Sequence, residues 1–213
     1  NVTITRFEVG KPAWYFYGYE FTGIDPQTGD PTFADLDKSG DITDNDKTMI
    51  GSGLPDFTYG LTLTAAYKGF DFVIFGSGSY GNKIFSCLNR PDFALNKLSY
   101  FTDDRWTQEN THGSMPRAGA ADMDKWMRST AAVFDGSFFK IKQMQLGYTL
   151  PKNILSKVCL ESMRLYCSLD DFFTFTSYEG FDPEVTGVGS SLGVDKGSYP
   201  NSRKIVLGVN LTF

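Results

Sequence analysis

The chain alternates apolar and polar residues, one by one, over five stretches that are long enough to form strands. The clearest stretch begins at Phe57, where aromatic and aliphatic side chains take every second position and mostly threonine and glycine fill the others. A second stretch follows the turn residues Lys68 and Gly69 and ends near Tyr80. Alternation with a period of two places one set of side chains on each face of a strand. Residues 57–80 therefore predict a hairpin with a short turn.

The other three alternating stretches lie later in the chain. Residues 136–176 predict two strands, at 137–150 and 162–176, and residues 203–213 predict a last strand that ends on Phe213. Residues 81–135 and 177–202 have no sustained period and are rich in polar residues, which predicts long loops. Residues 1–56 predict an aromatic strand followed by a loop. The fold class expected is all-β, with antiparallel strands.

Two architectures share this pattern of alternation. A soluble β-sandwich or jelly roll packs its apolar strand faces against a second sheet, whereas an outer-membrane barrel turns them toward lipid. Periodicity does not separate the two. The opposite face is polar at several positions, as a barrel lumen requires, and long loops at one end with short turns at the other are typical of such barrels. The polar positions are Thr62, Thr64, Lys68, Arg164, Ser168, Lys204, Asn210 and Thr212.

Composition adds three limits. The chain has 213 residues with 19 Phe, 11 Tyr and 22 Gly, which favours β-structure, and its formal net charge of −5 gives no basic surface for nucleic acid. The chain contains no apolar run of about 18 residues, so its sequence does not predict a transmembrane helix. The three cysteines, Cys87, Cys159 and Cys167, form no CxxC pair for zinc or redox chemistry. Because the chain opens at Asn1 without a signal peptide, we expect a piece of a longer exported protein.

One motif with a specific chemistry lies at residues 35–46. It matches a twelve-residue calcium loop, with glycine at position 6, where the chain must turn sharply, and the apolar Ile42 at position 8. Oxygen ligands are expected from Asp35, Asp37, Ser39, the backbone carbonyl of Asp41, Thr43 and Asp46.

Two features of this loop predict weak binding of calcium. Serine stands at position 5, and Asp46 replaces the bidentate glutamate of the EF-hand pattern at position 12. A dissociation constant of about 10⁻⁴–10⁻³ M, as in extracellular modules, is expected. The role expected for Ca²⁺ is structural, and the alternative is a metal-free loop whose aspartates cap its own backbone.

No catalytic constellation is visible. His112 is the single histidine and lies in a polar loop, and no nucleophile-elbow, phosphate-loop or dinucleotide motif occurs. The chain is therefore not expected to be an enzyme. Trp14, Trp106 and Trp126 are candidates for stacking on sugars if they project from loops, although packing or membrane-interface roles suit a single tryptophan better.

Several short motifs, in order along nearly the whole chain, together resemble the C-terminal region of SusC/RagA-type TonB-linked outer-membrane transporters. Each motif is weak alone, and their order and spacing carry the resemblance. The chain departs slightly where it has Asp170-Asp171-Phe172-Phe173-Thr174, because the family often has an asparagine before Leu-Phe-Thr. The motifs include Leu54-Pro55-Asp56-Phe57, Lys68-Gly69-Phe70-Asp71, Arg105-Trp106-Thr107, Leu146-Gly147-Tyr148, Gly180-Phe181-Asp182-Pro183 and Leu211-Thr212-Phe213.

This resemblance implies a parent protein with a 22-stranded outer-membrane barrel and an N-terminal plug, driven by TonB. It implies import of oligosaccharides, or of peptides, with a SusD-like lipoprotein as a lid over the extracellular loops. Residues 1–56, 81–135 and 177–202 would then hold the extracellular loops and 203–213 the closing strand. Phe213 would be the signal that the barrel-assembly machinery reads. Membrane lipid would surround the apolar strand faces, and glycans are the cargo most expected.

Two other interpretations stay open at this point. The chain could be a soluble, calcium-stabilised β module that binds carbohydrate at the cell surface, in which case its strand faces would pack on a second sheet. A dockerin-like module would also use a calcium loop, but dockerins need paired loops and helices, and only one such loop is present.

Overall fold

A computed structural model describes residues 4–88, 90, 98–155, 160–185 and 187–213. Two compact units share these residues. Unit 1 combines residues 1–56, 81–136 and 177–199, and unit 2 combines residues 57–80, 137–176 and 200–213. Each unit is therefore assembled from three separate stretches of the chain.

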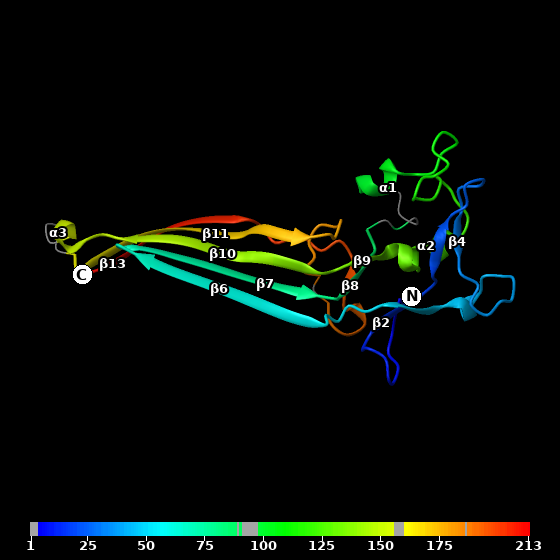
Figure 1. The fold of residues 1–213 in the computed structure, drawn as a ribbon, viewed down its shortest axis with the longest axis horizontal. Helices are drawn as coiled ribbons and strands as arrows, with labels where there is room; N and C mark the ends of the chain where they lie inside the picture. Colours follow the sequence, from blue (N-terminus) through cyan, green and yellow to red (C-terminus); the bar gives the residue numbers. More distant parts are fainter. Residues whose placement is uncertain (1–3, 89, 91–97, 156–159, 186) are drawn as a thin grey trace. The chain divides into compact units, whose positions relative to one another are not determined.

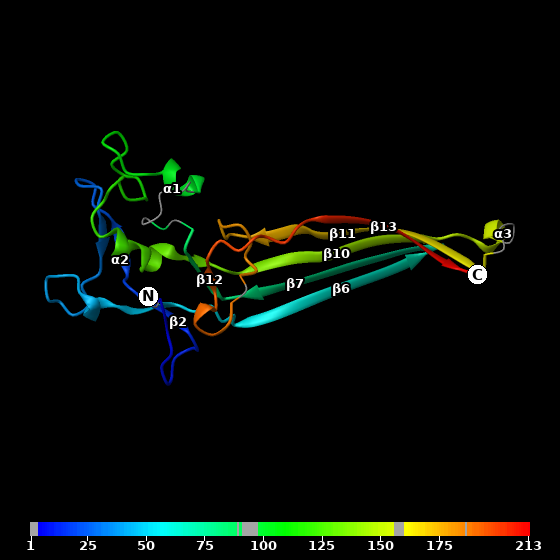
Figure 2. The same ribbon diagram turned by 180° about the vertical axis from the view of Figure 1, so that it is seen from behind.

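Unit 2 is a five-stranded antiparallel sheet. Its strands are long, and their order across the sheet is β13-β11-β10-β7-β6 (Figures 1 and 2). All five lie where alternation predicted strands. The strands are β6 (Phe57–Tyr67), β7 (Phe70–Tyr80), β10 (Phe138–Thr149), β11 (Ser162–Thr176) and β13 (Lys204–Thr212).

The connections at the two ends of this sheet differ in length. Lys68 and Gly69 join β6 to β7 with φ values of 48° and 88°, which is the two-residue hairpin turn whose twist matches that of the strands. Lys68 therefore belongs to the turn rather than to the polar face where alternation placed it. Residues 150–161, with the short helix α3 (Lys152–Leu155), join β10 to β11 at the same end. The long segments 81–137 and 177–203 connect strands at the other end.

The two faces of the sheet have different chemistry. Cross-strand register places Phe72, Leu146, Cys167 and Leu207 in one row on the apolar face, and Tyr166 on the opposite face beside Gly147 and Gly208. The apolar face is exposed in unit 2: Leu63 is 54% and Leu207 78% accessible. An apolar surface of this extent is a liability in water.

A β-bulge on β10 and an irregular residue on the neighbouring β11 interrupt the register of the sheet. The bulge falls between Ile141 and Gln143 on β10, and Asp171 opposite adopts a left-handed conformation with φ of 55°. The Lys142 ammonium lies 3.5 Å from the Asp171 carboxylate at this point. A bulge of this kind bends a strand and increases its twist.

Unit 1 is built from many short elements and contains a hydrophobic core. The centre of the core is Phe16, Phe85, Ala132 and Val194, with Ile4, Ile50, Cys87 and Val133 packed around it. The elements are β1 (Thr5–Arg6), β2 (Tyr15–Gly18) and β5 (Thr48–Gly51) in one sheet; β12 (Val194–Asp195), β8 (Lys83–Ser86) and β9 (Val133–Asp135) in a second; the hairpin β3 (Phe21–Ile24) and β4 (Pro31–Phe33); the helices α1 (Ser99–Asp103) and α2 (Met123–Met127); and the 3₁₀ turns η1 (Asp44–Asp46), η2 (Thr130–Ala132) and η3 (Gly189–Ser191).

This content differs from the expectation for residues 1–56 and 81–135. The first was expected to hold one strand and a loop but holds five short strands, and the second was expected to be a loop but contributes strands, helices and core residues. The reason is that strands of two to four residues are too short to show a period. Among the described residues, no helix has both the length and the apolar character needed to cross a bilayer.

Candidate functional site: the membrane face and the acidic loop

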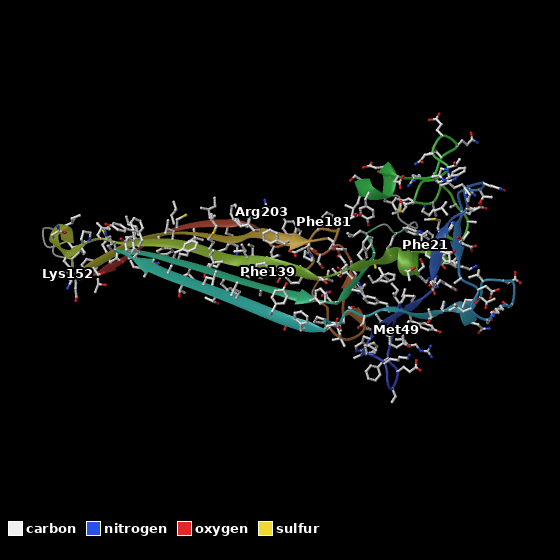
Figure 3. The ribbon with its side chains drawn as sticks, in the orientation of Figure 1. Phe21, Met49, Phe139, Lys152, Phe181 and Arg203 are labelled. Carbon is white, nitrogen blue, oxygen red and sulfur yellow. The ribbon has the colours of Figure 1, made fainter. Side chains whose placement is uncertain are left out.

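The apolar face of unit 2 is ordered along the strand direction. Aromatic rings gather at the end with long connections, where Tyr59 stacks with Phe139 at 5.9 Å, Phe139 with Phe175 at 6.3 Å and Phe57 with Tyr80 at 5.3 Å. Phe70 and Tyr148 pair at 4.5 Å beside the short turn. Mostly aliphatic residues occupy the rows between, with Phe72 and Phe173 among them. Phe139 is labelled on β10 in Figure 3.

These two aromatic belts have the spacing of a lipid bilayer. An eleven-residue strand such as β6 is about 34 Å long, and a tilt of about 40° reduces this to about 25 Å across the membrane. Aromatic side chains are enriched at both membrane interfaces, with aliphatic ones between them. The geometry is that of the lipid-facing wall of an outer-membrane barrel.

The opposite face carries an ion pair that spans three strands. Arg164 on β11 reaches over Gly147 on β10 to Asp71 on β7, with Nε 2.9 Å from Oδ1 and a second contact through Nη2. A side chain on Gly147 would collide with both partners. Tyr166 covers Gly208 on β13 in the same way. The pair forms only when all three strands are in register. Alternation placed Arg164 on this face, but nothing in the sequence indicated its partner.

The acidic loop at residues 35–46 lies in unit 1 and is closed around Asp46. This carboxylate is fully buried and accepts hydrogen bonds from the backbone N–H groups of Leu36 (2.8 Å), Asp37 (3.2 Å) and Thr43 (2.7 Å). Thr43 caps η1 with its hydroxyl, which completes a capping box with Asp46. The loop therefore has an internal frame of its own.

Three of the six expected metal ligands come together in this frame. Asp35, Asp37 and Asp46 each offer one carboxylate oxygen, and these oxygens lie within 4.8 Å of one another. Ser39 and Asp41 do not join them in the same way: the Ser39 hydroxyl donates to the Asp41 carbonyl at 3.0 Å. The Thr43 hydroxyl accepts from the N–H of Asn45 at 3.3 Å.

Hydrogen bonds favour the charged form of Asp37 and Asp46 in this loop. Donation from Ser39 lowers the pKa of Asp37, and the backbone N–H of Thr43 is the main cause that lowers the pKa of Asp46. Charged carboxylates are the form that binds a metal ion.

The loop is connected to the rest of unit 1 through Asp44. This residue accepts a hydrogen bond from the Tyr19 hydroxyl at 2.9 Å and pairs with Lys47 at 2.7 Å. Burial and the bond to Asp44 raise the pKa of Tyr19 to about 12. The Tyr19 backbone in turn bonds to Arg128 and Thr130 at 2.9 and 3.0 Å. Sequence reasoning missed Tyr19 and Asp44, because neither belongs to a ligand position of the motif.

The three candidate tryptophans lie apart, each with its own packing. Trp106 covers Gly29, and its Nε1 donates to the carbonyl of Pro26 at 3.2 Å, which fixes the tip of the β3–β4 hairpin. Trp126 is buried, with 3% of its surface accessible. Trp14 packs on the exposed Phe7 at 5.6 Å. Trp14 and Trp106 are both half-buried, so neither presents a fully exposed ring.

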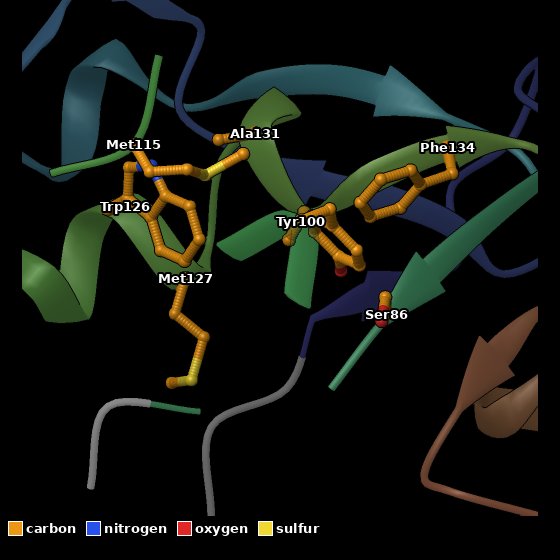
Figure 4. A pocket seen from close by; sticks show the side chains of 8 residues that line it. Ser86, Tyr100, Met115, Trp126, Met127, Ala131 and Phe134 are labelled. Carbon is orange, nitrogen blue, oxygen red and sulfur yellow. The ribbon is translucent and has the colours of Figure 1, made fainter. Parts of the chain in front are cut away.

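A small pocket lies beside Trp126 in unit 1. Tyr100, Met115, Met127 and Phe134 are among its walls, together with Ser86 (Figure 4). The pocket has room for about one water molecule, which is too little for a sugar ring. It is part of the packing of unit 1 rather than a cargo site.

Phe213, the expected assembly signal, directly follows β13. Its side chain is 87% accessible, and the neighbouring Thr212 pairs with Ser162 of β11. It falls on the apolar face, in alternation with Leu211.

Comparison with known proteins identifies what this membrane face belongs to. The chain is 33% identical over 228 aligned positions to TonB-dependent receptor P3 of Formosa agariphila. This alignment covers 96% of this chain and 22% of that protein. It is 27% identical to the TonB-dependent receptor SusC of Bacteroides thetaiotaomicron, over 100% of this chain and 21% of that protein. No protein-family profile matches the chain.

Solved structures agree with the sequence relatives. The RagAB peptide importer in its closed-closed state superposes with a TM-score of 0.80 at 28% identity, over 99% of this chain and 24% of the other. The open-open state gives a TM-score of 0.78 at the same identity. The chain belongs to the SusC/RagA family of TonB-dependent receptors.

The family settles the environment of unit 2. TonB-dependent receptors are outer-membrane β-barrel proteins, so the apolar face of the five strands faces lipid, as the resemblance implied. This excludes the soluble sandwich, in which that face would pack on a second sheet. The relatives are receptors and transporters rather than enzymes. The chain spans less than a quarter of the length of the relatives and structures that it matches.

Proposed function

We propose that this chain is part of a TonB-dependent importer that takes nutrient oligomers, oligosaccharides foremost, across the outer membrane together with a SusD-like surface lipoprotein. The lipid-facing sheet carries this proposal, since five strands with two aromatic belts suit a section of barrel wall. The long segments of unit 1 leave the sheet at the end opposite the tight turn. Outer-membrane barrels place long loops outside the cell and short turns in the periplasm, so unit 1 faces the exterior.

Neutral hydrogen-bonding groups on the lumen face support an oligosaccharide as cargo. Thr62, Thr64, Gln143 and Gln145 lie on the face opposite the lipid-facing residues. Asp71 and Arg164, on the same face, neutralise each other as an ion pair. Hydroxyl and amide groups of this kind pair with sugar hydroxyls. Peptides are the second candidate, because the RagAB structures that this chain resembles at 28% identity are those of a peptide importer.

Uptake by living cells tests this function. A strain that lacks the full-length transporter, and the same strain with the gene restored, would be grown on single polysaccharides and on peptide mixtures as the carbon source. Loss of growth on a glycan, restored by the gene, is the expected result. Loss of growth on peptides alone would replace the glycan with the peptide alternative, and unchanged growth on every source would refute nutrient import.

We also propose that the loop at residues 35–46 binds Ca²⁺ in a structural role. The twelve-residue spacing and the three converging carboxylates of Asp35, Asp37 and Asp46 support this. Ser39, Thr43 and the carbonyl of Asp41 would complete the ligand set. Calcium would fix this exposed loop of unit 1.

Calorimetry on the purified transporter tests the calcium site with a matched pair of variants. Asp37→Asn removes a ligand charge while its amide oxygen keeps the hydrogen bond from Ser39, so we expect Ca²⁺ affinity to fall at least about tenfold with the fold retained. Asp41→Asn removes a charge at a position that supplies only its backbone carbonyl, so affinity should change much less. Equal losses in both variants, or no binding by the unmodified protein at millimolar Ca²⁺, would refute the site.

A further inference from the structure

Charge is divided unevenly between the two units. Unit 1 holds 21 acidic and 12 basic residues, whereas unit 2 holds 4 acidic and 8 basic ones. Unit 1 thus has an excess of nine negative charges, and unit 2 an excess of four positive ones. A calcium ion in the acidic loop would still leave an excess of seven. The negative charge of the whole chain therefore comes from the unit that faces the exterior.

Ion pairs within unit 1 leave this excess unchanged, because each pair cancels one charge of each sign. Among the described residues, the basic side chains within ion-pair distance of an acidic residue of the same unit include Arg6, Lys47, Lys83, Arg117, Lys125 and Arg128. Glu20, Glu109 and Glu179 are among the exposed acidic residues of the described chain and come from three different segments. The negative surface is therefore spread over unit 1 and is wider than the loop at residues 35–46.

The local structure keeps two of these carboxylates ionised. Backbone N–H donors lower the pKa of Asp25, and donation from Ser114 lowers the pKa of Asp104. Groups whose pKa lies below the usual range stay charged in neutral and mildly acidic media. The excess is thus a constant feature of the surface.

We infer that unit 1 sorts cargo by charge, admitting neutral and basic oligomers and repelling acidic ones such as uronic-acid or sulfated oligosaccharides. This rests on the proposed import function and narrows its substrate class. A surface with one dominant sign of charge changes the local concentration and the association rate of charged ligands by about tenfold or more, and salt weakens the effect. The Debye length is about 8 Å at physiological ionic strength, so cargo that reaches the surface of unit 1 experiences its charge.

The test uses the full-length transporter with its lipoprotein in detergent. It is incubated with an equimolar pool of neutral, uronic-acid and amino-sugar oligosaccharides and of acidic, neutral and basic peptides of matched length, and mass spectrometry identifies what is retained. At low salt, acidic members should be depleted about tenfold relative to neutral ones of the same class, and high salt should remove the difference. Retention of acidic members equal to or above that of neutral ones would overturn the inference.

A triple variant links the effect to unit 1. Glu20→Gln, Glu109→Gln and Glu179→Gln together remove three charges, and the depletion of acidic members should shrink by about threefold at low salt. The control, with aspartate at the same three positions, keeps the charge and should behave like the unmodified protein. Unchanged depletion in the glutamine variant would overturn the inference while leaving import intact. If nothing in the pool is retained at any salt, the proposed import function fails, and the inference with it.

Discussion

Replacing Gly18 by alanine is expected to destabilise unit 1 by about 3 kcal/mol or more, because the new methyl group has no space. A Cβ atom on Gly18 would overlap the carbonyl oxygen of Arg128 and lie 2.9 Å from Cδ1 of Ile50. The same carbonyl accepts the hydrogen bond of the Tyr19 N–H, and Tyr19 accepts one from Thr130. Backbone atoms do not yield as side chains do, so the substitution would separate residues 18–21 from 128–130.

Hydrogen exchange on the detergent-solubilised transporter measures this effect. Amide protection at Tyr19 and Thr130 should be lost in the variant, and segment 104–130 should become sensitive to trypsin. Gly60→Ala is the matched control, since no atom would lie closer than 3.7 Å to a methyl group there and no left-handed backbone is involved. Protection at Tyr19 equal to that of the unmodified protein would show that this junction does not hold unit 1 together.

Replacing Asp46 by alanine is expected to disorder the acidic loop even without calcium. The Asp46 carboxylate is the common acceptor for the N–H groups of Leu36, Asp37 and Thr43. Its removal leaves three partly buried donors without this acceptor, and an unsatisfied donor costs more than the mean value of the bond itself. Exchange at these three amides should accelerate by about two orders of magnitude in calcium-free buffer.

Asp37→Asn is the comparison for this experiment, because the Asp37 side chain lies at the surface and its replacement should break no hydrogen bond of the Asp46 frame. The pH dependence gives a second reading. Since the folded-state pKa of Asp46 is lowered, its contribution to stability is complete above about pH 4 and disappears as the pH falls through the lowered pKa. A loop that stays equally protected in the Asp46→Ala variant, or that loosens between pH 7 and 5, would contradict the role given to this carboxylate.

Alternation along the chain predicted the long strands of unit 2 because each of their faces has one environment. Leu61 and Leu63 face lipid while Thr62 faces the lumen, so the polarity of each residue indicates the face of the strand on which its side chain lies. The resemblance to SusC/RagA transporters, made on short motifs, was confirmed by the relatives and by the RagAB structures. The motif at residues 35–46 named six calcium ligands, and the carboxylate oxygens of Asp35, Asp37 and Asp46 lie within 4.8 Å of one another because loop ligands are close in sequence. Calcium binding itself stays a prediction.

Unit 1 was far less predictable, and its residues show why. Phe16, Phe85 and Val194 form one core but come from three segments that are each short and irregular. The hydrogen bond between Tyr19 and Asp44 joins residues 25 positions apart in the sequence, and that between Trp106 and Pro26 joins residues 80 positions apart. A local pattern of apolar and polar residues cannot indicate contacts between such distant positions. The tryptophans were candidates for ligand binding on residue type alone, and the contacts that bury Trp126 and hold Trp106 arise only from the tertiary fold.

The glycines of the five-stranded sheet suggest how this wall can change over evolutionary time. Gly76 and Gly78 of β7 lie beneath the rings of Phe139 and Tyr59, which belong to the strands on either side, and Gly147 and Gly208 are covered from β11 in the same way. In each case a side chain from a neighbouring strand fills the space that the glycine leaves by having no Cβ atom. A larger residue at Gly76 becomes acceptable when the Phe139 ring shrinks, whereas at Gly78 a new Cβ would also overlap the backbone carbonyl oxygen of Phe138. We therefore expect substitutions here to occur in compensating pairs, so that the wall evolves by the joint exchange of neighbours.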